Sequence, residues 1–141
     1  MSYSEWLAAI CLWREARGVS MAAKTAIWHV IQNRTLDAQR RWPRTIAGVI
    51  LQHAQFSSFL QSDPNVTRFP IPPTPGQDAS ADWLAFLDCQ TVVESPLAAD
   101  PVGGANMYHS FSFTDPAQYP SWTREAKLTA TIGGISFYVL L

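Results

Sequence analysis

The sequence Trp13-Arg14-Glu15-Ala16-Arg17-Gly18 closes an almost unbroken apolar run that begins at Trp6. Because the run is apolar on every side of a helix, we expect this helix to be buried rather than half-exposed. Glu15 then lies in the last turn of a buried helix. Apolar neighbours and the negative end of the helix dipole both disfavour an ionised carboxylate there. A general acid that works near neutral pH needs a carboxyl group whose ionised form is disfavoured in this way. Arg14 or Arg17 would instead favour the ionised form if either reached the carboxylate.

Helix boundaries can be predicted on both sides of Glu15. Ser2 and Glu5 have the spacing of a capping box, which predicts where the first helix begins. Gly18 suits the left-handed conformation that ends a helix. A second helix is expected from Ser20, as its N-cap, to about Arg34. Its apolar stripe comprises Ala23, Ala26, Ile27, Val30 and Ile31, and Lys24 and Gln32 are expected to face outward.

Two further helices are expected in the middle of the chain. Pro43 follows Trp42 and suits the first position of a third helix. The packing face of that helix comprises Ile46, Val49 and Ile50. Residues 61–79 are rich in Pro, Asp, Ser and Gln, and the prolines of 69–76 exclude a helix or a central strand. A fourth helix is expected from a cap at Ser80 or Asp78 to about Ser95. Its expected packing residues are Trp83, Phe86, Leu87 and Val93.

The C-terminal residues alternate between apolar and polar side chains, which is typical of strands. The apolar positions are Leu128, Ala130 and Ile132 before Gly133-Gly134, and Ile135, Phe137 and Val139 after it. Two adjacent glycines favour a tight hairpin turn. Earlier in the chain, the glycines of Asp100-Pro101-Val102-Gly103-Gly104-Ala105 indicate another turn, and residues 106–109 follow as an extended piece. The expected fold class is α+β, predominantly α-helical, with a small C-terminal β-hairpin.

The composition is typical of an ordered globular chain. Its 141 residues, 48% hydrophobic and 15% charged, predict a single domain over residues 1–141. A net charge of −1 gives no long-range field, so nucleic acid is not expected as a partner. Cys11 and Cys89 are interpreted as buried thiols rather than a disulfide. The apolar run from Trp6 is too short for a membrane span and lacks the flanks of a signal peptide. We expect a monomer that is made in the cytoplasm.

Several segments carry a family resemblance. They are Arg14-Glu15-Ala16-Arg17-Gly18, Ile31-Gln32-Asn33-Arg34, Gln55-Phe56-Ser57, the turn from Asp100 to Ala105, Pro120-Ser121-Trp122, Ile132-Gly133 and Phe137-Tyr138. In this order, from about residue 6 to residue 138, they resemble the bacterial cell wall hydrolases of the spore cortex-lytic type. The chain departs from the family pattern at Ile135, where a histidine is usual, and at Val19, where an acidic residue is usual.

The resemblance implies a lysozyme-like domain that degrades peptidoglycan. Glu15 would be the general acid, and then the base, in cleavage of the β-1,4 bond between N-acetylmuramic acid and N-acetylglucosamine. The implied substrate-binding residues are Gln55, Phe56, Ser57, Tyr108, His109 and Trp122. Asn33-Arg34 is interpreted as structural, binding the turn that follows it. No metal and no cofactor is implied. Without a signal peptide, a phage or prophage endolysin that a holin releases to the cell wall would fit.

Two other classes of protein stay open. His29, His53 and His109 permit a zinc-dependent wall amidase or peptidase, although they lack the His-Glu-x-x-His spacing. In a non-catalytic glycan-binding module, Glu15 would be an ordinary member of an ion pair. Ordinary glycosidases need a second carboxylate. The candidates for it are Asp37, Asp63, Asp100 and Asp115. A lytic transglycosylase needs one carboxylate alone, because the same group acts first as acid and then as base.

Overall fold

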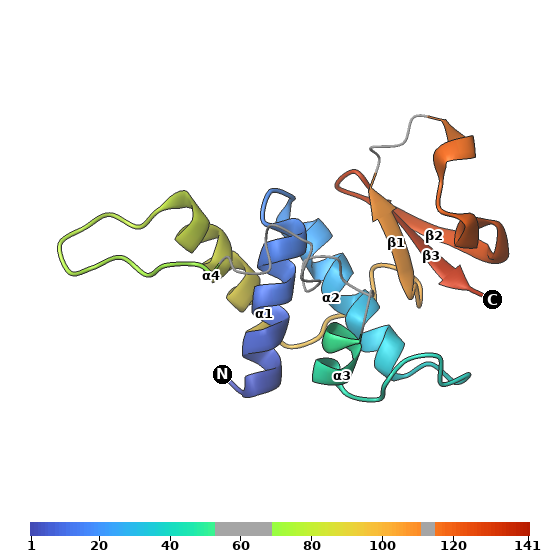
Figure 1. The fold of residues 1–141 in the computed structure, drawn as a ribbon, viewed down its shortest axis with the longest axis horizontal. Helices are drawn as coiled ribbons and strands as arrows, with labels where there is room; N and C mark the ends of the chain where they lie inside the picture. The colour runs from blue at the N-terminus through green and yellow to red at the C-terminus, as the bar shows by residue number, and fades with distance from the viewer. Residues whose placement is uncertain (53–68, 111–114) are drawn as a thin grey trace.

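A computed structural model describes residues 1–52, 69–110 and 115–141. Four helices lie on one side of the molecule, and a three-stranded antiparallel sheet lies on the other (Figure 1). The helices are α1 (Tyr3–Ala16), α2 (Met21–Thr35), α3 (Ile46–Leu51) and α4 (Ala81–Glu94). The strands are β1 (Met107–Ser110), β2 (Ala126–Ile132) and β3 (Ile135–Leu140), and two short 3-10 helices, η2 (Pro116–Gln118) and η3 (Ser121–Glu125), precede β2. The predicted fold class, α+β and mainly helical, is confirmed.

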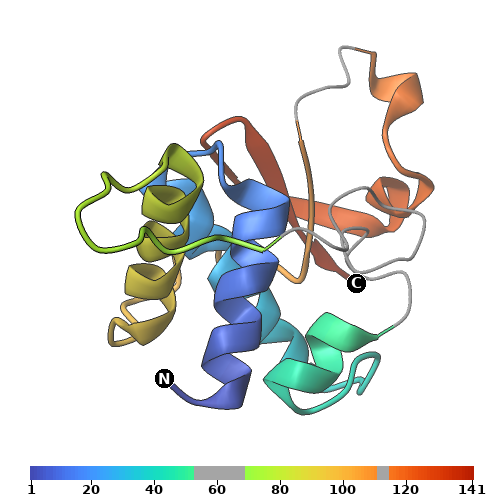
Figure 2. The same ribbon diagram turned by 60° about the vertical axis from the view of Figure 1, so that its left-hand side comes forward.

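Helix α1 passes through the centre of the helical part, as its all-round apolar character predicts (Figure 2). Its capping box is present, since the Ser2 hydroxyl accepts from the Glu5 amide and the Glu5 carboxylate accepts from the Ser2 amide. The predicted end of the helix just before Gly18 is confirmed, but the left-handed conformation predicted for Gly18 is wrong. Helix α1 ends at Ala16, and Gly18 does not have a positive φ. A left-handed cap is not needed there, because the Lys24 ammonium donates to the carbonyls of Arg17 and Val19.

Helix α2 begins at the predicted cap, where the Ser20 hydroxyl accepts from the Ala23 amide. All five residues of its predicted apolar stripe are buried. Lys24 was expected to face outward, and that prediction is wrong, because its side chain is only 3% exposed. Its apolar stem is buried and its ammonium binds carbonyls just beyond the end of α1, as the charged ends of long amphipathic side chains often do.

Helices α3 and α4 each differ from expectation at one residue. Pro43 does not occupy the first position of α3, because the hydroxyl of Thr45 accepts from the Gly48 amide and caps a helix that begins at Ile46. Val49 and Ile50 are buried as predicted, and Ile46 packs against the core. Ser80 caps α4 as predicted. The packing residues Phe86 and Val93 are buried and Trp83 packs against the core, whereas Leu87 is wrongly predicted, because it faces solvent.

The sheet has the strand order β1–β3–β2, so the predicted hairpin gains a third strand along β3. The hairpin is confirmed, with Gly133 and Gly134 both at positive φ (56° and 79°) in its turn. Strand β2 carries a bulge, because Leu128 pairs with Tyr138 and Ala130 pairs with the preceding residue, Phe137. The extra residue breaks the alternation of faces, which explains why Leu128 is 53% exposed against expectation.

The buried core lies mainly between α1, α2, α3 and α4, and extends to β3. Helix α1 is fastened to the start of α4 by the Trp13 indole, which donates a 3.0 Å hydrogen bond to the Asp82 carbonyl. Cys11 and Cys89 are free, buried thiols, as predicted. None of the helices in the described part is both long enough and apolar enough to cross a bilayer.

Candidate active site

Glu15 lies half-buried in the last turn of α1, as predicted, and the side chains around it come from three elements. Burial raises the pKa of Cys11, one turn earlier on the same face of α1, and the charge of Glu15 raises it further. Burial raises the pKa of Tyr108 on β1 well above its usual value, and Glu15 adds to this, whereas Arg34 of α2 opposes it. The Tyr108 hydroxyl therefore stays protonated beside the carboxyl group.

Two arginines flank Glu15 in the sequence, and each stacks on an aromatic ring. The Arg14 guanidinium lies 5.0 Å from the centre of the Phe69 ring, and that of Arg17 lies 4.8 Å from the centre of the Trp13 ring. Such contacts stabilise a cation by up to about 2 kcal/mol when desolvated. Phe69 is 54% exposed and begins the proline-rich segment before α4, which extends away from the helices (Figures 1 and 2). Arg14 thus holds the base of this segment beside the end of α1.

The Asp100–Ala105 turn has the predicted two glycines at positive φ, with Gly103 at 58° and Gly104 at 82°. The Asp100 carboxylate accepts hydrogen bonds from the amides of Val102 (2.8 Å) and Gly104 (2.7 Å). Burial alone would raise the pKa of Asp100, but these two amides and the Asn33 side chain together lower it. Asp100 is therefore an ionised turn residue.

The C-terminal end of α2 holds this turn and the start of β1. The Asn33 amide donates to the Asp100 carboxylate (3.1 Å) and to the Ala105 carbonyl (2.9 Å). The Arg34 Nε donates to the Asn106 carbonyl at 2.7 Å. The sequence predicted that Asn33-Arg34 binds the turn that follows it. The side chains instead bind a segment some seventy residues later, because the chain folds back over the end of α2.

The structure places the other candidate residues of β1 and η3 on two faces of the sheet. Tyr108 pairs with Phe137, and the two rings lie 6.0 Å apart on the face toward the helices. His109, one residue later, points to the opposite face, as successive residues of a strand do. Its ring stacks on Tyr138 at 5.3 Å and lies 6.0 Å from Trp122. The charge of Glu15 acts on Tyr108, whereas His109 lies with Trp122 on the other face.

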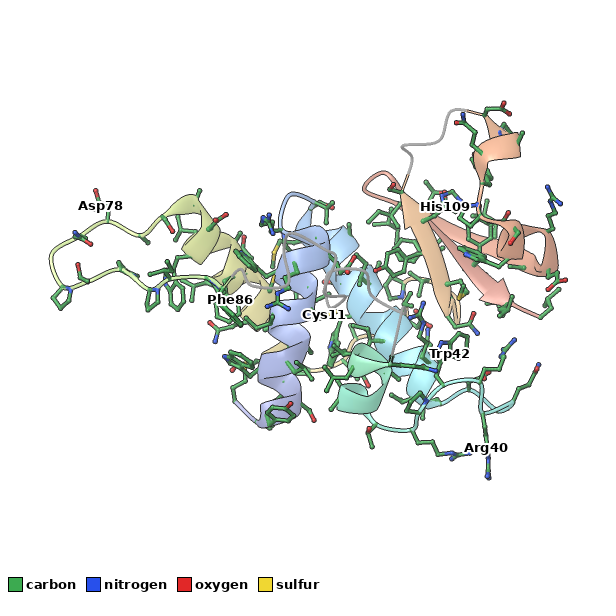
Figure 3. All side chains as sticks on the ribbon, in the orientation of Figure 1. Cys11, Arg40, Trp42, Asp78, Phe86 and His109 are labelled. Carbon is green, nitrogen blue, oxygen red and sulfur yellow. The ribbon has the colours of Figure 1, made fainter. Side chains whose placement is uncertain are left out.

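The cluster around His109 is an aromatic layer on the outer face of the sheet, which we define as His109, Tyr119, Trp122 and Tyr138. The His109 Nε2 lies 2.9 Å from the Tyr138 hydroxyl, and the Tyr119 ring lies 4.8 Å from the His109 ring. Figure 3 shows His109 at the sheet, far from Cys11 in the helical part. His109 is buried, while Trp122 is half-buried. Whether His109 and Trp122 bind substrate stays a prediction.

Gln55, Phe56 and Ser57 lie outside the described residues, as do His53 and Asp63. The remaining candidates for a second carboxylate are each engaged. Asp37 binds Arg41 through both oxygens (2.9 and 3.0 Å), and Asp115 caps η2 by accepting from the Ala117 amide. Within residues 1–52, 69–110 and 115–141, no three His, Cys, Asp or Glu side chains are grouped to hold a metal ion.

Two surface pockets lie away from Glu15. One, of about 340 Å³, is lined by residues that include Ser4, Trp28 and Glu94, near the opposite end of α1. The other, of about 570 Å³, lies between the end of α2 and the end of β3, with Asn33, Arg41 and Leu140 in its walls. Neither pocket has Glu15 in its wall. The candidate active site is therefore defined by the side chains that interact with Glu15 rather than by these cavities.

Sequence reasoning missed two residues of this site. The first is Arg34, for which the sequence predicts only binding to the following turn. Its place at the end of the apolar stripe of α2 is a signal that its charge is buried. The second is Phe69, which has no expected role, because the prediction for residues 69–76 rests only on their prolines. An aromatic residue just before Pro70-Ile71-Pro72-Pro73 is a candidate for packing such a loop against the helices. Its partner Arg14 cannot be predicted, because it is 55 residues away in the sequence.

The comparisons with known proteins agree with this architecture. A family profile described as cell wall hydrolase matches residues 18–138. The chain therefore belongs to the cell wall hydrolase family, and the predicted family is confirmed. The matched range begins three residues after Glu15, so it does not test that residue. No curated protein matches the chain.

Two solved structures share the fold. One is the catalytic domain of the SleB protein of Bacillus cereus, with 24% identity over 96% of this chain and 88% of that chain, and a TM-score of 0.60. The other is the catalytic domain of the germination-specific lytic transglycosylase SleB of Bacillus anthracis, with 22% identity over 98% and 96% of the two chains, and a TM-score of 0.62. At these identities the similarity establishes a common fold.

Proposed function

We propose that this protein cleaves the β-1,4 bond between N-acetylmuramic acid and N-acetylglucosamine in peptidoglycan. Membership of the cell wall hydrolase family supports the substrate class. The observation that carries the reaction type is that Glu15 is half-buried at the end of α1, where its charge acts on both Tyr108 and Arg34. One of the two structures that share the fold is described as a lytic transglycosylase, which fits a site with one carboxyl group.

Glu15 has the surroundings of a residue that changes protonation state during a reaction. Glu15 lies half-buried in the last turn of α1. The positive charge of Arg34 favours the carboxylate once the proton has left. Tyr108 offers a hydroxyl that stays protonated and can donate a hydrogen bond to the substrate or to Glu15. A carboxyl group with a cation and a hydroxyl donor acting on it can serve first as acid and then as base.

A single carboxyl group also suggests the product. Glu15 protonates the glycosidic oxygen, and the bond to the anomeric carbon of muramic acid breaks. The acetamido oxygen of the same sugar supports the positive charge that remains. Glu15 then takes the proton of the 6-hydroxyl, whose oxygen closes a 1,6-anhydro ring. The atoms balance without water, and no second carboxylate is needed. Among the described acidic candidates, Asp37, Asp100 and Asp115 are bound to their own segments.

The substrate contacts form two groups. Tyr108 lies beside the proposed acid, and Gln55, Phe56 and Ser57 are proposed to bind the acetamido group and ring of a neighbouring sugar. His109 and Trp122 belong to the aromatic layer on the other face of the sheet. If they bind glycan, they do so at a distance from the bond that is cleaved.

Replacing Glu15 with glutamine tests the proposal. The amide keeps the shape of the side chain but cannot donate and retake a proton, so clearing of purified cell walls should fall at least about 100-fold. Far-UV circular dichroism and the melting temperature should be unchanged. A folded Glu15→Gln variant with wild-type turnover would reject the role of Glu15. A wild-type protein that binds cell walls without releasing any product would indicate a glycan-binding module instead.

A further inference from the structure

We propose that Arg34 is a positioning residue of this site, whose buried guanidinium holds the start of β1 against the end of α2 and supplies a fixed positive charge that acts on Glu15 and Tyr108. The inference rests on the proposed function for its kinetic consequences. Its structural part concerns the substrate-free protein and can be tested alone.

The first support is the way in which Arg34 holds the backbone. Its side chain is 4% exposed, and its Nε donates a 2.7 Å hydrogen bond to the carbonyl of Asn106, the residue immediately before β1. The neighbouring Asn33 amide holds the preceding carbonyl, that of Ala105. Two successive residues at the end of α2 therefore bind two successive carbonyls. Tyr108 follows two residues later in β1, so this attachment acts together with the pairing of β1 with β3 to position it.

The second support is the charge. Burial lowers the pKa of Arg34, and electrostatic interactions with Tyr108, Cys11 and Glu15 oppose that effect. An arginine nevertheless keeps its proton in a protein, so the guanidinium remains a cation. A buried cation is costly unless nearby groups stabilise it. Here these groups are the Asn106 carbonyl, the Trp42 ring with its centre 5.3 Å away, and the charge of Glu15.

The chemical consequence concerns the moment at which Glu15 has given its proton to the substrate. A cation that is already fixed in place stabilises the new carboxylate without any rearrangement. The same guanidinium attaches the start of β1, the strand that carries Tyr108, to α2. A displacement of about 1 Å in such a site can lower the rate about 100-fold. Arg34 would therefore act through Glu15 and Tyr108 rather than by touching the substrate.

Arg41 provides a matched control. Its guanidinium also lies 5.3 Å from the centre of the Trp42 ring, so it stacks on the same indole as Arg34. Figure 3 shows Trp42 near the C-terminal end of α2. Unlike Arg34, Arg41 is half-exposed and pairs with Asp37. Loss of Arg41 removes a stacked cation from Trp42 and two hydrogen bonds to the carbonyls of Leu140 and Leu141, but leaves the bond between Arg34 and Asn106 intact.

The experiment compares Arg34→Met, Arg34→Lys and Arg41→Met with the wild-type enzyme on solubilised glycan strands. We expect Arg34→Met to lower kcat about 100-fold while KM changes less than about threefold, because positioning acts on the transition state. The pH profile of kcat should change in this variant as well. Arg34→Lys keeps the charge and should restore the wild-type pH profile with only part of the rate. Arg41→Met should match the wild type in kcat, KM and pH profile.

The ring resonances of Tyr108 in substrate-free protein give a readout that does not depend on turnover. They should shift in Arg34→Met and Arg34→Lys but not in Arg41→Met. A folded Arg34→Met protein with wild-type kcat and pH profile would overturn the proposal. If Arg34→Met does not fold, unchanged kcat and Tyr108 resonances in Arg34→Lys would overturn it. If the wild type releases no product, the proposed function is rejected, but the Tyr108 resonances still test the positioning role. Resonances that stay unshifted in every variant would overturn that role as well.

Discussion

The ammonium of Lys24 donates a 2.7 Å hydrogen bond to the carbonyl of Val19, just beyond the end of α1. A second, longer bond of 3.4 Å reaches the carbonyl of Arg17. These carbonyls belong to the segment that follows Glu15, at the negative end of the helix dipole. A buried lysine of α2 thus closes the helix that carries the proposed acid, in place of the left-handed glycine cap that the sequence predicts.

Lys24→Met should destabilise the protein. Methionine keeps most of the apolar stem but leaves the Val19 carbonyl without its donor, and a buried polar group left unsatisfied costs about 1–3 kcal/mol. The free energy of unfolding, measured by urea titration, should fall by that amount. Lys127→Met is the control, because Lys127 is exposed on β2. Equal stabilities for the two variants would show that the Lys24 bond contributes nothing measurable.

The turn of the C-terminal hairpin should not tolerate a side chain at Gly133. A Cβ there would lie 2.8 Å from the Ala23 Cβ and the Ser20 hydroxyl, and φ is +56°. Left-handed backbone costs an alanine about 1–2 kcal/mol, and overpacking adds about 1–3 kcal/mol. Gly133→Ala should therefore lose about 3 kcal/mol in thermal or urea unfolding.

Two other glycines separate these contributions. Gly76 has φ +84° with no atom within 4 Å of an added Cβ, so Gly76→Ala should lose only the backbone part. Gly18 has neither a positive φ nor a close neighbour, and Gly18→Ala should be nearly neutral. A Gly133→Ala loss no larger than that of Gly76→Ala would show that the hairpin moves freely away from α2.

Local signals predicted most of the fold. The caps at Ser2, Ser20 and Ser80 are short-range hydrogen bonds, and the sequence carries all their partners within three residues. The predictions of side-chain orientation are wrong where a residue distant in the sequence determines the contact. The periodicity of α2 cannot reveal that Lys24 meets carbonyls at the end of another helix. The alternation of β2 cannot reveal a bulge, because pairing with β3 creates it.

The candidate site was only partly predictable for the same reason. The place of Glu15 follows from the apolar run before it, which is a local pattern. The contacts of Arg34 with Asn106 and of Arg14 with Phe69 join residues more than fifty positions apart, so no spacing indicates them. The separation of Tyr108 from His109 was available in the sequence, since neighbouring residues of a strand point to opposite faces.

Tyr108→Phe tests the proposed role of the tyrosine hydroxyl. The ring should keep its packing on Phe137, so the melting temperature should change little. Loss of one hydrogen bond of about 1.4 kcal/mol in the transition state would lower kcat about tenfold. Tyr138→Phe removes the hydroxyl that contacts His109 on the other face and should leave kcat unchanged. A large fall in melting temperature with normal turnover would make Tyr108 a structural residue.

Activity should survive removal of metal ions. The histidines lack the spacing of a zinc site, and the proposed mechanism uses one carboxyl group and groups of the substrate. Dialysis against a strong chelator, followed by assay on purified cell walls, should give the rate of an untreated sample. Loss of activity that added zinc restores would favour the zinc-dependent amidase or peptidase over the glycosidase.

The most direct test of the account is the mass spectrum of the fragments that the protein releases from purified peptidoglycan. Cleavage by Glu15 with ring closure predicts muropeptides that end in 1,6-anhydro-muramic acid, lighter by one water than hydrolytic products. The folded Glu15→Gln variant should release none of them. Fragments with cut amide bonds and intact glycan, or the same anhydro fragments from Glu15→Gln, would contradict the central role assigned to Glu15.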